Sequence, residues 1–192
     1  MIAGNDLLIG TSDVLTSRSF KRRIILFKGV LIFSLCLGLA FLPQCGRKVK
    51  ESGAAPDFTL KTLEGEEMAL TSLKGKVVLL DFWATWCAPC RESIPHLVNL
   101  QKDFGEKGLV ILGMSADKGE GDVVRRFVKS MDIPYPVVIT PDEVLRSYGV
   151  TALPTTVFID RKGKIREKTI GFNSRIGKQM AEKAEELTSE KP

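Results

Sequence analysis

Histidine and cysteine are scarce in this sequence of 192 residues, which contains one histidine and four cysteines. A structural zinc site requires four ligands. Apart from the closely spaced pair Cys87 and Cys90, the only His or Cys candidates are His96, Cys36 and Cys45. Because Cys36 and Cys45 lie in an N-terminal segment that differs in composition from the rest, we predict no metal site.

A large excess of charge of one sign is also missing from most of the chain. The net charge is +5, but residues 1–45 hold five Lys or Arg and two Asp or Glu. Removing these from the totals of 28 basic and 23 acidic residues leaves 23 and 21. A nearly neutral remainder gives no support for nucleic-acid binding, so we expect no nucleic-acid partner.

The sequence has no uninterrupted apolar run of membrane-spanning length. The segment Ile24–Leu42 is interrupted by Lys28, which leaves 14 residues from Gly29 to Leu42, whereas a spanning helix needs about 20. Basic residues precede the run, as in signals that keep the N-terminus in the cytoplasm and export the rest of the chain. We therefore predict an export signal, with a cleaved signal peptide as the first interpretation.

Cys45 suggests how the exported protein could stay at the membrane. Leu42 to Gly46 resembles a bacterial lipoprotein cleavage box in which Cys45 would be lipidated, although Gln44 replaces the usual small residue. A lipoprotein and an uncleaved signal anchor are equally favoured, above a soluble secreted form. We divide the chain into an extension with export signal or anchor (1–45), a tether (46–55) and a folded domain (56–192).

The most informative stretch joins a predicted strand to a predicted helix. Val77 to Phe82 is a short apolar run rich in β-branched residues, typical of a strand buried on both faces. Cys87 and Cys90 come after it. Beyond them, apolar residues recur at helical spacing, at Ile94, Leu97, Val98 and Phe104. The two cysteines are therefore predicted at a strand-to-helix corner.

This corner favours redox chemistry. Cys87, at the helix start, would meet free backbone N–H groups and the positive end of the helix dipole, which should lower its pKa below about 8.5. Cys90 lies one turn further along and is more shielded. We predict Cys87 as the attacking sulfur and Cys90 as the resolving one. A purely structural disulfide would stabilise little, because so short a loop constrains the unfolded chain least.

The remaining pattern alternates strands and helices, which indicates an α/β fold with a central mixed sheet and helices on both faces. Two hairpins are predicted, one of Asp57–Leu60 and Glu66–Leu70 and one of Thr155–Ile159 and Lys164–Thr169, with two further strands at Leu109–Met114 and Tyr135–Ile139. One helix is predicted to be capped by Asp122, and another to begin with a capping box from Thr140 to Glu143. A last helix starts at Asn173 and carries Ile176, Met180, Ala184 and Leu187 inward.

These motifs resemble the thioredoxin superfamily. Asp81 to Ala84, Trp86 to Cys90, and Pro95 are similar to the thioredoxin active-site strand and helix. The N-terminal hairpin, an inserted helix and strand between Asp117 and Thr140, and Tyr148 to Thr156 resemble the membrane-anchored TlpA/ResA-like branch. The resemblance covers about Ala55 to Leu187 and implies a thioredoxin-like fold.

The resemblance implies roles for individual residues. Pro154 would be a cis-proline facing the cysteines, and Asp81 a buried acid that exchanges a proton with Cys90. Substrate would bind along Trp86, Ala88, Pro89, Leu153 and Pro154. Alternatives remain open: a trans Leu153–Pro154 bond before a strand, a satisfied strand-end carboxylate at Asp81, and a packing role for Trp86.

Two departures from the family pattern affect these roles. Many relatives carry a glutamate three positions after the second cysteine, where this chain has Ser93, with Glu92 one place earlier. The lysine that partners the buried acid in thioredoxin has no counterpart in Leu109–Met114. Asp81 would therefore depend on water or backbone groups.

Together these features predict an extracytoplasmic, membrane-attached thiol-disulfide oxidoreductase that needs no cofactor beyond its own Cys87–Cys90 disulfide. Family resemblance favours a reductant of disulfides in exported proteins, for example in cytochrome c maturation, recharged by a membrane thiol-electron donor. The alternatives are an oxidant or isomerase, and a binding module without turnover. A peroxidase would need a lone peroxidatic cysteine in its own pocket, and none is found.

Overall fold

The computed structural model describes residues 48–49, 53–119 and 121–191. These residues belong to a compact unit, Gly46–Pro192. The predictions about the export signal and about Cys45 lie outside the described residues. Within the described part of the chain, no helix combines the length and apolar character that a membrane span requires.

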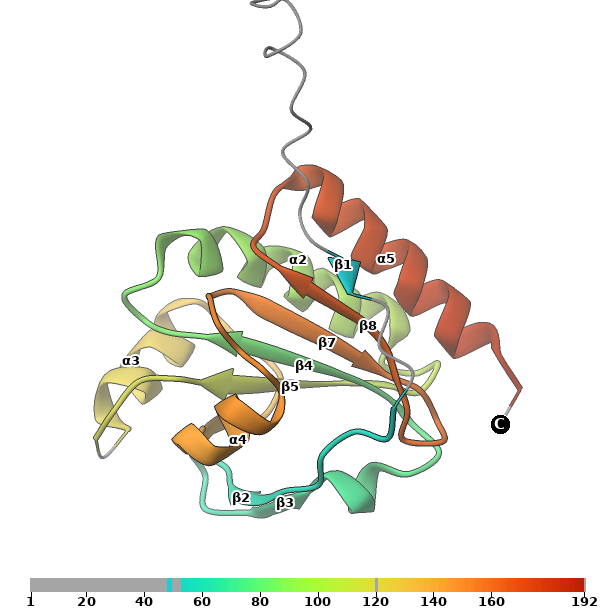
Figure 1. Cartoon of the computed structure of the whole chain (residues 1–192). Helices are drawn as coiled ribbons and strands as arrows, with labels where there is room; N and C mark the ends of the chain where they lie inside the picture. The colour runs from blue at the N-terminus through green and yellow to red at the C-terminus, as the bar shows by residue number, and fades with distance from the viewer. Residues whose placement is uncertain (1–47, 50–52, 120, 192) are drawn as a thin grey trace, which may run out of the picture. The chain divides into compact units, whose positions relative to one another are not determined.

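The central sheet is mixed, as predicted (Figure 1). Its middle strand β4 (Val77–Trp83) pairs in parallel with β5 (Leu109–Ser115), which pairs in parallel with β6 (Val137–Ile139). On its other side, β4 pairs antiparallel with β7 (Thr155–Ile159). The strand β8 (Ile165–Ile170) pairs antiparallel with β7, and the short β1 (Lys48–Val49) adds to its outer edge.

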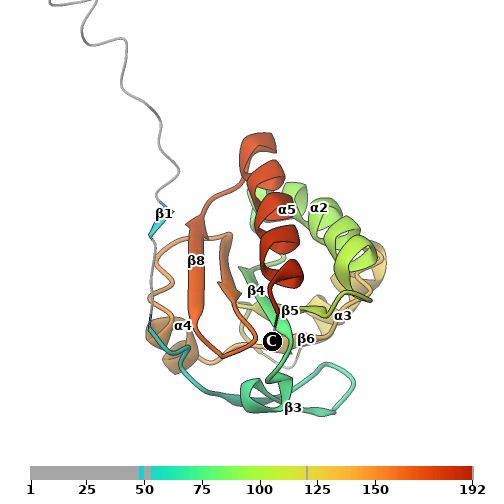
Figure 2. The ribbon, with the colours of Figure 1, turned by 90° about the vertical axis from the view of Figure 1, so that its right-hand side faces the viewer.

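Helices cover both faces of this sheet. Figure 1 shows α2 (Ala88–Phe104) and α5 (Ser174–Ser189) on one side, and Figure 2 shows that they run next to each other. The helix α3 (Asp122–Ser130) contributes Val124 to the same apolar cluster. The other face carries α4 (Asp142–Ser147), the 3-10 turn η1 (Leu70–Leu73) and the hairpin of β2 (Thr59–Lys61) and β3 (Glu67–Ala69).

The strand β4 lies at the centre because every one of its residues is buried and all but Asp81 are apolar. Successive side chains of a strand point to opposite faces. Leu79 and Trp83 accordingly join the cluster that includes α2 and α5, whereas Leu80 and Phe82 join the cluster on the hairpin and α4 face. This double burial holds the end of β4 rigidly where the cysteine corner begins.

Several local predictions are confirmed. The helix that carries the cysteines ends at Phe104, directly before Gly105. Asn173 caps α5, its side-chain oxygen accepting a hydrogen bond of 2.9 Å from the backbone N–H of Ile176. The apolar stripe predicted for this helix is buried: Ile176, Met180, Ala184 and Leu187.

The caps predicted for the other two helices are wrong. Gly121, with φ 83°, stands at the N-cap of α3, so Asp122 is the first helical residue instead of the cap. Pro141 holds an extended conformation before α4, which begins one residue later than the predicted capping box requires. The backbone N–H of Thr140 donates to the carbonyl oxygen of Ser115, which extends the β5 edge and leaves the Thr140 hydroxyl without a capping role.

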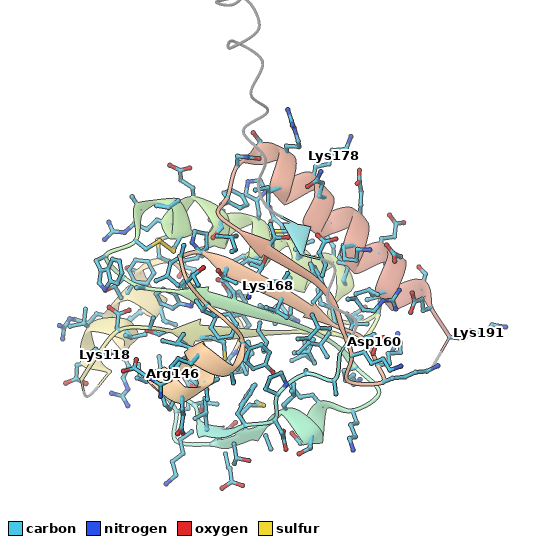
Figure 3. All side chains as sticks on the ribbon, in the orientation of Figure 1. Lys118, Arg146, Asp160, Lys168, Lys178 and Lys191 are labelled. Carbon is cyan, nitrogen blue, oxygen red and sulfur yellow. A yellow bond between two sulfur atoms is a disulfide. The ribbon has the colours of Figure 1, made fainter. Side chains whose placement is uncertain are left out.

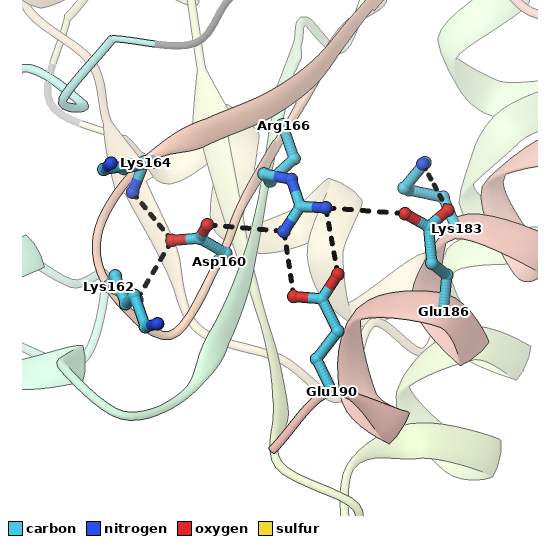
Figure 4. Close-up of polar contacts among 7 residues, drawn as sticks. All are labelled: Asp160, Lys162, Lys164, Arg166, Lys183, Glu186 and Glu190. Carbon is cyan, nitrogen blue, oxygen red and sulfur yellow. Dashed lines mark hydrogen bonds and ion pairs between the residues drawn. The ribbon is translucent and has the colours of Figure 1, made fainter. Parts of the chain in front are cut away.

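Both ends of the folded domain are tied to the β7–β8 hairpin. Residues expected in the tether contribute to this: Ala55 N–H donates to the Gly163 carbonyl oxygen, and the Gly53 carbonyl accepts from Ile165 N–H. At the C-terminus, Arg166 binds Glu190 through two hydrogen bonds of 2.8 and 2.9 Å and also contacts Asp160 (Figure 4). Part of the segment predicted as a tether therefore packs onto the domain.

Candidate active site

Cys87 and Cys90 form a disulfide at the corner between β4 and α2, with Cα atoms 5.3 Å apart. Cys87 is the N-cap residue of α2, in an extended conformation, and its N–H donates to the carbonyl oxygen of Ala84. Ala88 and Pro89 are the first helical residues. The exposed fraction is 6% for Cys87 and 0% for Cys90, so Cys87 is the sulfur that a partner can reach.

The corner is held by polar contacts that sequence reasoning missed. The backbone N–H and hydroxyl of Thr85 donate to the two carboxylate oxygens of Asp117, and the Ser115 hydroxyl donates to the same carboxylate. From α2, the Arg91 guanidinium donates twice to the Thr85 carbonyl, at 3.1 and 2.7 Å. The one sequence signal for this contact is the position of Asp117, a polar residue that follows shortly after the buried strand β5.

An apolar groove of about 540 Å³ opens beside Cys87. Its walls include Trp86, Ala88 and Pro89 from the corner, Leu145 from α4, and Val150 and Leu153 from the loop before β7. Trp86 is 70% exposed, so it lies on the rim of this groove and does not pack in the core. The groove combines a reachable disulfide with apolar walls, a combination suited to an extended polypeptide.

The loop on the far wall contains a cis peptide bond between Leu153 and Pro154. The cis bond is as the resemblance implied, and the trans alternative is wrong. The Pro154 carbonyl oxygen accepts from the Gly171 N–H at 2.7 Å, which fastens the loop to the end of β8. The buried Lys168 amine (labelled in Figure 3) donates to the carbonyl oxygens of Tyr148 and Gly149 and holds the start of the same loop.

Asp81 is fully buried in β4, on the face that packs against α2. It alternates with Phe82 and Leu80, and it shares its face with Leu79 and Trp83, which lie in an apolar cluster with Cys90. Neither carboxylate oxygen has a hydrogen-bond partner in the described part of the chain. Burial raises the pKa of Asp81 from 3.8 to about 7, because the charged form loses its water. Such a group can take up or release a proton near neutral pH.

Gly113 of β5 is the register partner of Asp81. A Cβ atom at Gly113 would come within 2.9 Å of Val137 Cγ2, so any larger side chain would force its neighbours to shift. Ser93 is buried and its hydroxyl donates to the Cys90 carbonyl oxygen, whereas Glu92 is exposed. Glu92 therefore does not occupy the position of the family glutamate.

His96 lies on α2 with its ring against that of Phe172, at a centroid distance of 5.0 Å. It is a packing contact between α2 and the segment before α5. Among the described residues, no three His, Cys, Asp or Glu side chains are grouped so that they could hold a metal ion.

Comparison with known proteins agrees with this site. The model of the AhpC/TSA family matches residues 52–168. The chain is 37% identical to a thiol-disulfide oxidoreductase ResA of Bacillus cereus over 157 residues, covering 79% of this chain and 90% of that protein. It is 41% identical to the thioredoxin-like protein YneN of Bacillus subtilis (strain 168) over 137 residues, 70% of this chain and 79% of that protein.

Solved structures agree as well. A protein from Chlorobium tepidum assigned as thiol:disulfide interchange protein DsbE superposes with a TM-score of 0.69 at 31% identity, covering 73% of this chain and 99% of that chain. The thioredoxin domain of a thiol-disulfide oxidoreductase from Bacteroides vulgatus gives a TM-score of 0.66 at 28% identity, with the same coverage of 73% and 99%. The chain therefore belongs to the AhpC/TSA family of thioredoxin-like proteins, as a thiol-disulfide oxidoreductase of the ResA type.

Proposed function

We propose that this oxidoreductase works outside the cytoplasmic membrane, attached to it by its N-terminal segment, as a reductant of disulfides in exported proteins. The observation that carries the chemistry is the Cys87–Cys90 disulfide beside an apolar groove, with the buried Asp81 on the same face as the cysteines. The basic residues before Ile24–Leu42 support export, and Cys45 offers a lipid attachment point.

The reaction begins with the reduced enzyme. The Cys87 thiolate attacks one sulfur of a substrate disulfide, and the other substrate sulfur leaves as a thiolate. In the mixed disulfide, the Cys90 thiol gives its proton to the Asp81 carboxylate. The Cys90 thiolate then attacks Cys87 Sγ, which releases the second substrate sulfur as a thiolate. The substrate gains two electrons, and the enzyme is left with its own disulfide.

The site geometry supplies three parts of this cycle. The start of α2 presents backbone N–H groups to Cys87, which favours its thiolate form. The groove and the cis Leu153–Pro154 loop give an extended substrate a surface next to the sulfur. Asp81, with a pKa of about 7, can accept a proton from Cys90 without a permanent charge in the core.

A further dithiol must restore the reduced enzyme after each cycle. We assign this role to a membrane thiol-electron donor, because the enzyme is proposed to stay at the membrane surface. Exported apocytochrome c, whose haem-binding cysteines must be reduced before haem attachment, is the substrate that the family resemblance favours. The direction of the reaction depends on the reduction potential of the enzyme relative to those of its partners.

Trapping of partners tests this proposal. In Cys90→Ser, Cys87 can still attack, but nothing resolves the mixed disulfide, so partners should accumulate on Cys87. The expected set is small and contains a membrane dithiol donor and exported proteins with Cys-x-x-Cys-His motifs. The double variant Cys87→Ser/Cys90→Ser is the matched control and should trap none of them. Wild-type enzyme should be mostly reduced in cells.

A broad set of newly exported proteins, with the wild-type enzyme mostly oxidised, would overturn the direction and indicate an oxidant or isomerase. A binding module without turnover is the other alternative. It predicts that wild-type protein does not speed the reduction of insulin by a small dithiol, whereas the proposed enzyme should do so and Cys87→Ser should not.

A further inference from the structure

Three buried polar groups near the cysteines have no hydrogen-bond partner in the described part of the chain. They are the carboxylate of Asp81, the indole N–H of Trp83 and the hydroxyl of Tyr135. Their side chains are 0%, 0% and 4% exposed. Buried polar groups without a partner are rare, and several of them close together indicate a place where a bound water can join them.

Gly113 shows how close these groups come to one another. It is the register partner of Asp81 across the β4–β5 pair. A Cβ atom at Gly113 would lie 3.1 Å from Trp83 Nε1 and 3.4 Å from Tyr135 Cε2. The absence of a side chain at Gly113 therefore leaves room for the indole and the phenol beside the residue that pairs with Asp81.

Among the described residues, no charged side chain balances Asp81. The start of α2 faces Asp81 with the side that carries Cys87 and Cys90. The neighbouring strands place Thr156 of β7 and Gly113 of β5 beside it. The segment before β6 contributes Tyr135. Burial is the single cause of its raised pKa, and no neighbouring cation offsets it. Any stabilisation of the ionised carboxylate must come from neutral donors.

Tyr135 is suited to be such a donor. Burial, together with the charge of Asp81, raises the pKa of Tyr135 far above neutrality, so its hydroxyl keeps its proton throughout the working range. The Tyr135 ring also lies beside Gly113, the register partner of Asp81, so the two side chains occupy the same part of the core. A group that never ionises can donate a hydrogen bond, but it cannot replace Asp81 as the proton acceptor.

We propose that Tyr135 is a positioning residue for the resolving step, whose hydroxyl donates a hydrogen bond to one water molecule that in turn donates to the ionised Asp81 carboxylate. The proposal rests on the role of Asp81 given above. The proton still moves from the Cys90 thiol to Asp81, and Tyr135 exchanges neither protons nor electrons. A buried water typically makes about three hydrogen bonds, and Asp81, Tyr135 and Trp83 provide that number of partners.

The test compares Tyr135→Phe with the wild type. The Asp81 ionisation midpoint is read from its side-chain carboxyl ¹³C signal in the NMR spectrum, and the resolving rate is measured against pH. Loss of one hydrogen bond to the ionised form should raise the midpoint by about half to one pH unit. The resolving rate at pH 7 should then fall roughly two- to fivefold, because less of Asp81 is ionised.

The chain offers a matched control, since Tyr148 is its only other tyrosine. The Tyr148 side chain is also buried, but its hydroxyl donates to the Pro56 carbonyl at 2.6 Å on the opposite face of the sheet. Tyr148→Phe should leave the Asp81 midpoint and the pH profile where they are. An unmoved midpoint in Tyr135→Phe, or an equal shift in Tyr148→Phe, would overturn the proposal.

A second measurement covers the case in which Tyr135→Phe does not fold. In Tyr148→Phe, Tyr135 is the only tyrosine, so its ring ¹³C signal can be followed alone. That signal should titrate with Asp81 near pH 7, and Asp81→Asn should abolish the titration. If the Tyr135 signal in Tyr148→Phe does not change with pH, Tyr135 does not sense the ionisation of Asp81 and the proposal is wrong. If Asp81→Asn leaves the resolving rate unchanged while the midpoint shift is present, the proton-acceptor role fails but the Tyr135–Asp81 link stands.

Discussion

Thr85 and Asp117 are joined by two hydrogen bonds, from the Thr85 backbone N–H at 2.8 Å and from its hydroxyl at 2.7 Å. Asp117 also accepts from the Ser115 hydroxyl at 2.9 Å. This carboxylate therefore connects the end of β5 to the residue two places before Cys87. It fixes the path of the chain into the active-site helix.

Asp117→Ala should destabilise the protein by about 2 to 4 kcal/mol, because it leaves buried donors of Thr85 and Ser115 unpaired. Disulfide reduction of insulin should also slow, since the corner before Cys87 is no longer held. Chemical unfolding and the insulin assay measure the two effects. Asp142→Ala, at an exposed carboxylate bound to Lys118, is the control, and it should lower stability only slightly and leave the insulin assay unchanged. Equal stability of wild type and Asp117→Ala would contradict this role.

Asp81 should make stability depend on pH. Its folded pKa of about 7 lies above the unfolded value near 4, so the folded state binds more protons between these limits. The contribution of Asp81 to stability is therefore greatest below pH 4 and falls as pH rises from 4 through 7, by about 4 kcal/mol in all. Asp81→Asn should remove this slope and be more stable than wild type at pH 8, as measured by urea unfolding.

Asp142→Asn provides a control of opposite sign. A hydrogen bond from Lys118 lowers the pKa of Asp142, so this carboxyl adds stability above its unfolded pKa and loses it as pH falls. The variant should lose a little stability at neutral pH and none in acid. A wild-type slope that survives in Asp81→Asn would show that another group causes it.

The two thiols of the reduced enzyme should differ in acidity. Cys87 is the N-cap of α2 and Cys90 is fully buried one turn further along. Alkylation rates measured against pH, in Cys90→Ser and Cys87→Ser respectively, should show Cys87 ionising at lower pH and reacting faster. The assignment of the attacking sulfur fails if Cys90 is the thiol that ionises first.

Gly113→Ala should lower stability by about 1 to 3 kcal/mol, because the added methyl group would crowd Val137 and the Trp83 indole. It should also change the Asp81 midpoint, since the Trp83 indole must shift. Gly53→Ala is the control, because a Cβ atom there would meet nothing within 4 Å. Comparable unfolding curves for the two variants would argue against close packing at Gly113.

Membrane attachment should depend on the residues before Gly46. If Cys45 carries a lipid, Cys45→Ala should change electrophoretic mobility and release the domain from membranes in a fractionation experiment. Unchanged mobility and unchanged attachment would favour the uncleaved signal anchor, with Ile24–Leu42 as the anchoring segment. Deletion of residues 1–45 should release the protein in either case.

The sequence by itself was sufficient for the elements and for the sulfur pair. The apolar run of β4, the helical spacing after Cys90 and the Asn173 cap are short-range patterns, and residues a few positions apart determine them. Short-range patterns were weaker at α3 and α4. There, the actual caps depended on Gly121 in a left-handed conformation and on Thr140 continuing the edge of the sheet.

Only the tertiary structure decided the surroundings of the cysteines. Thr85 and Asp117 are 32 residues apart, and Tyr135 reaches the neighbourhood of Asp81 from a segment 54 positions later. Nothing in the local sequence specifies such contacts, because they depend on which strands pair and in which register. The raised pKa of Asp81 also depends on the tertiary structure. It comes from burial between β5, β7 and α2, and burial is a property of the assembled layers.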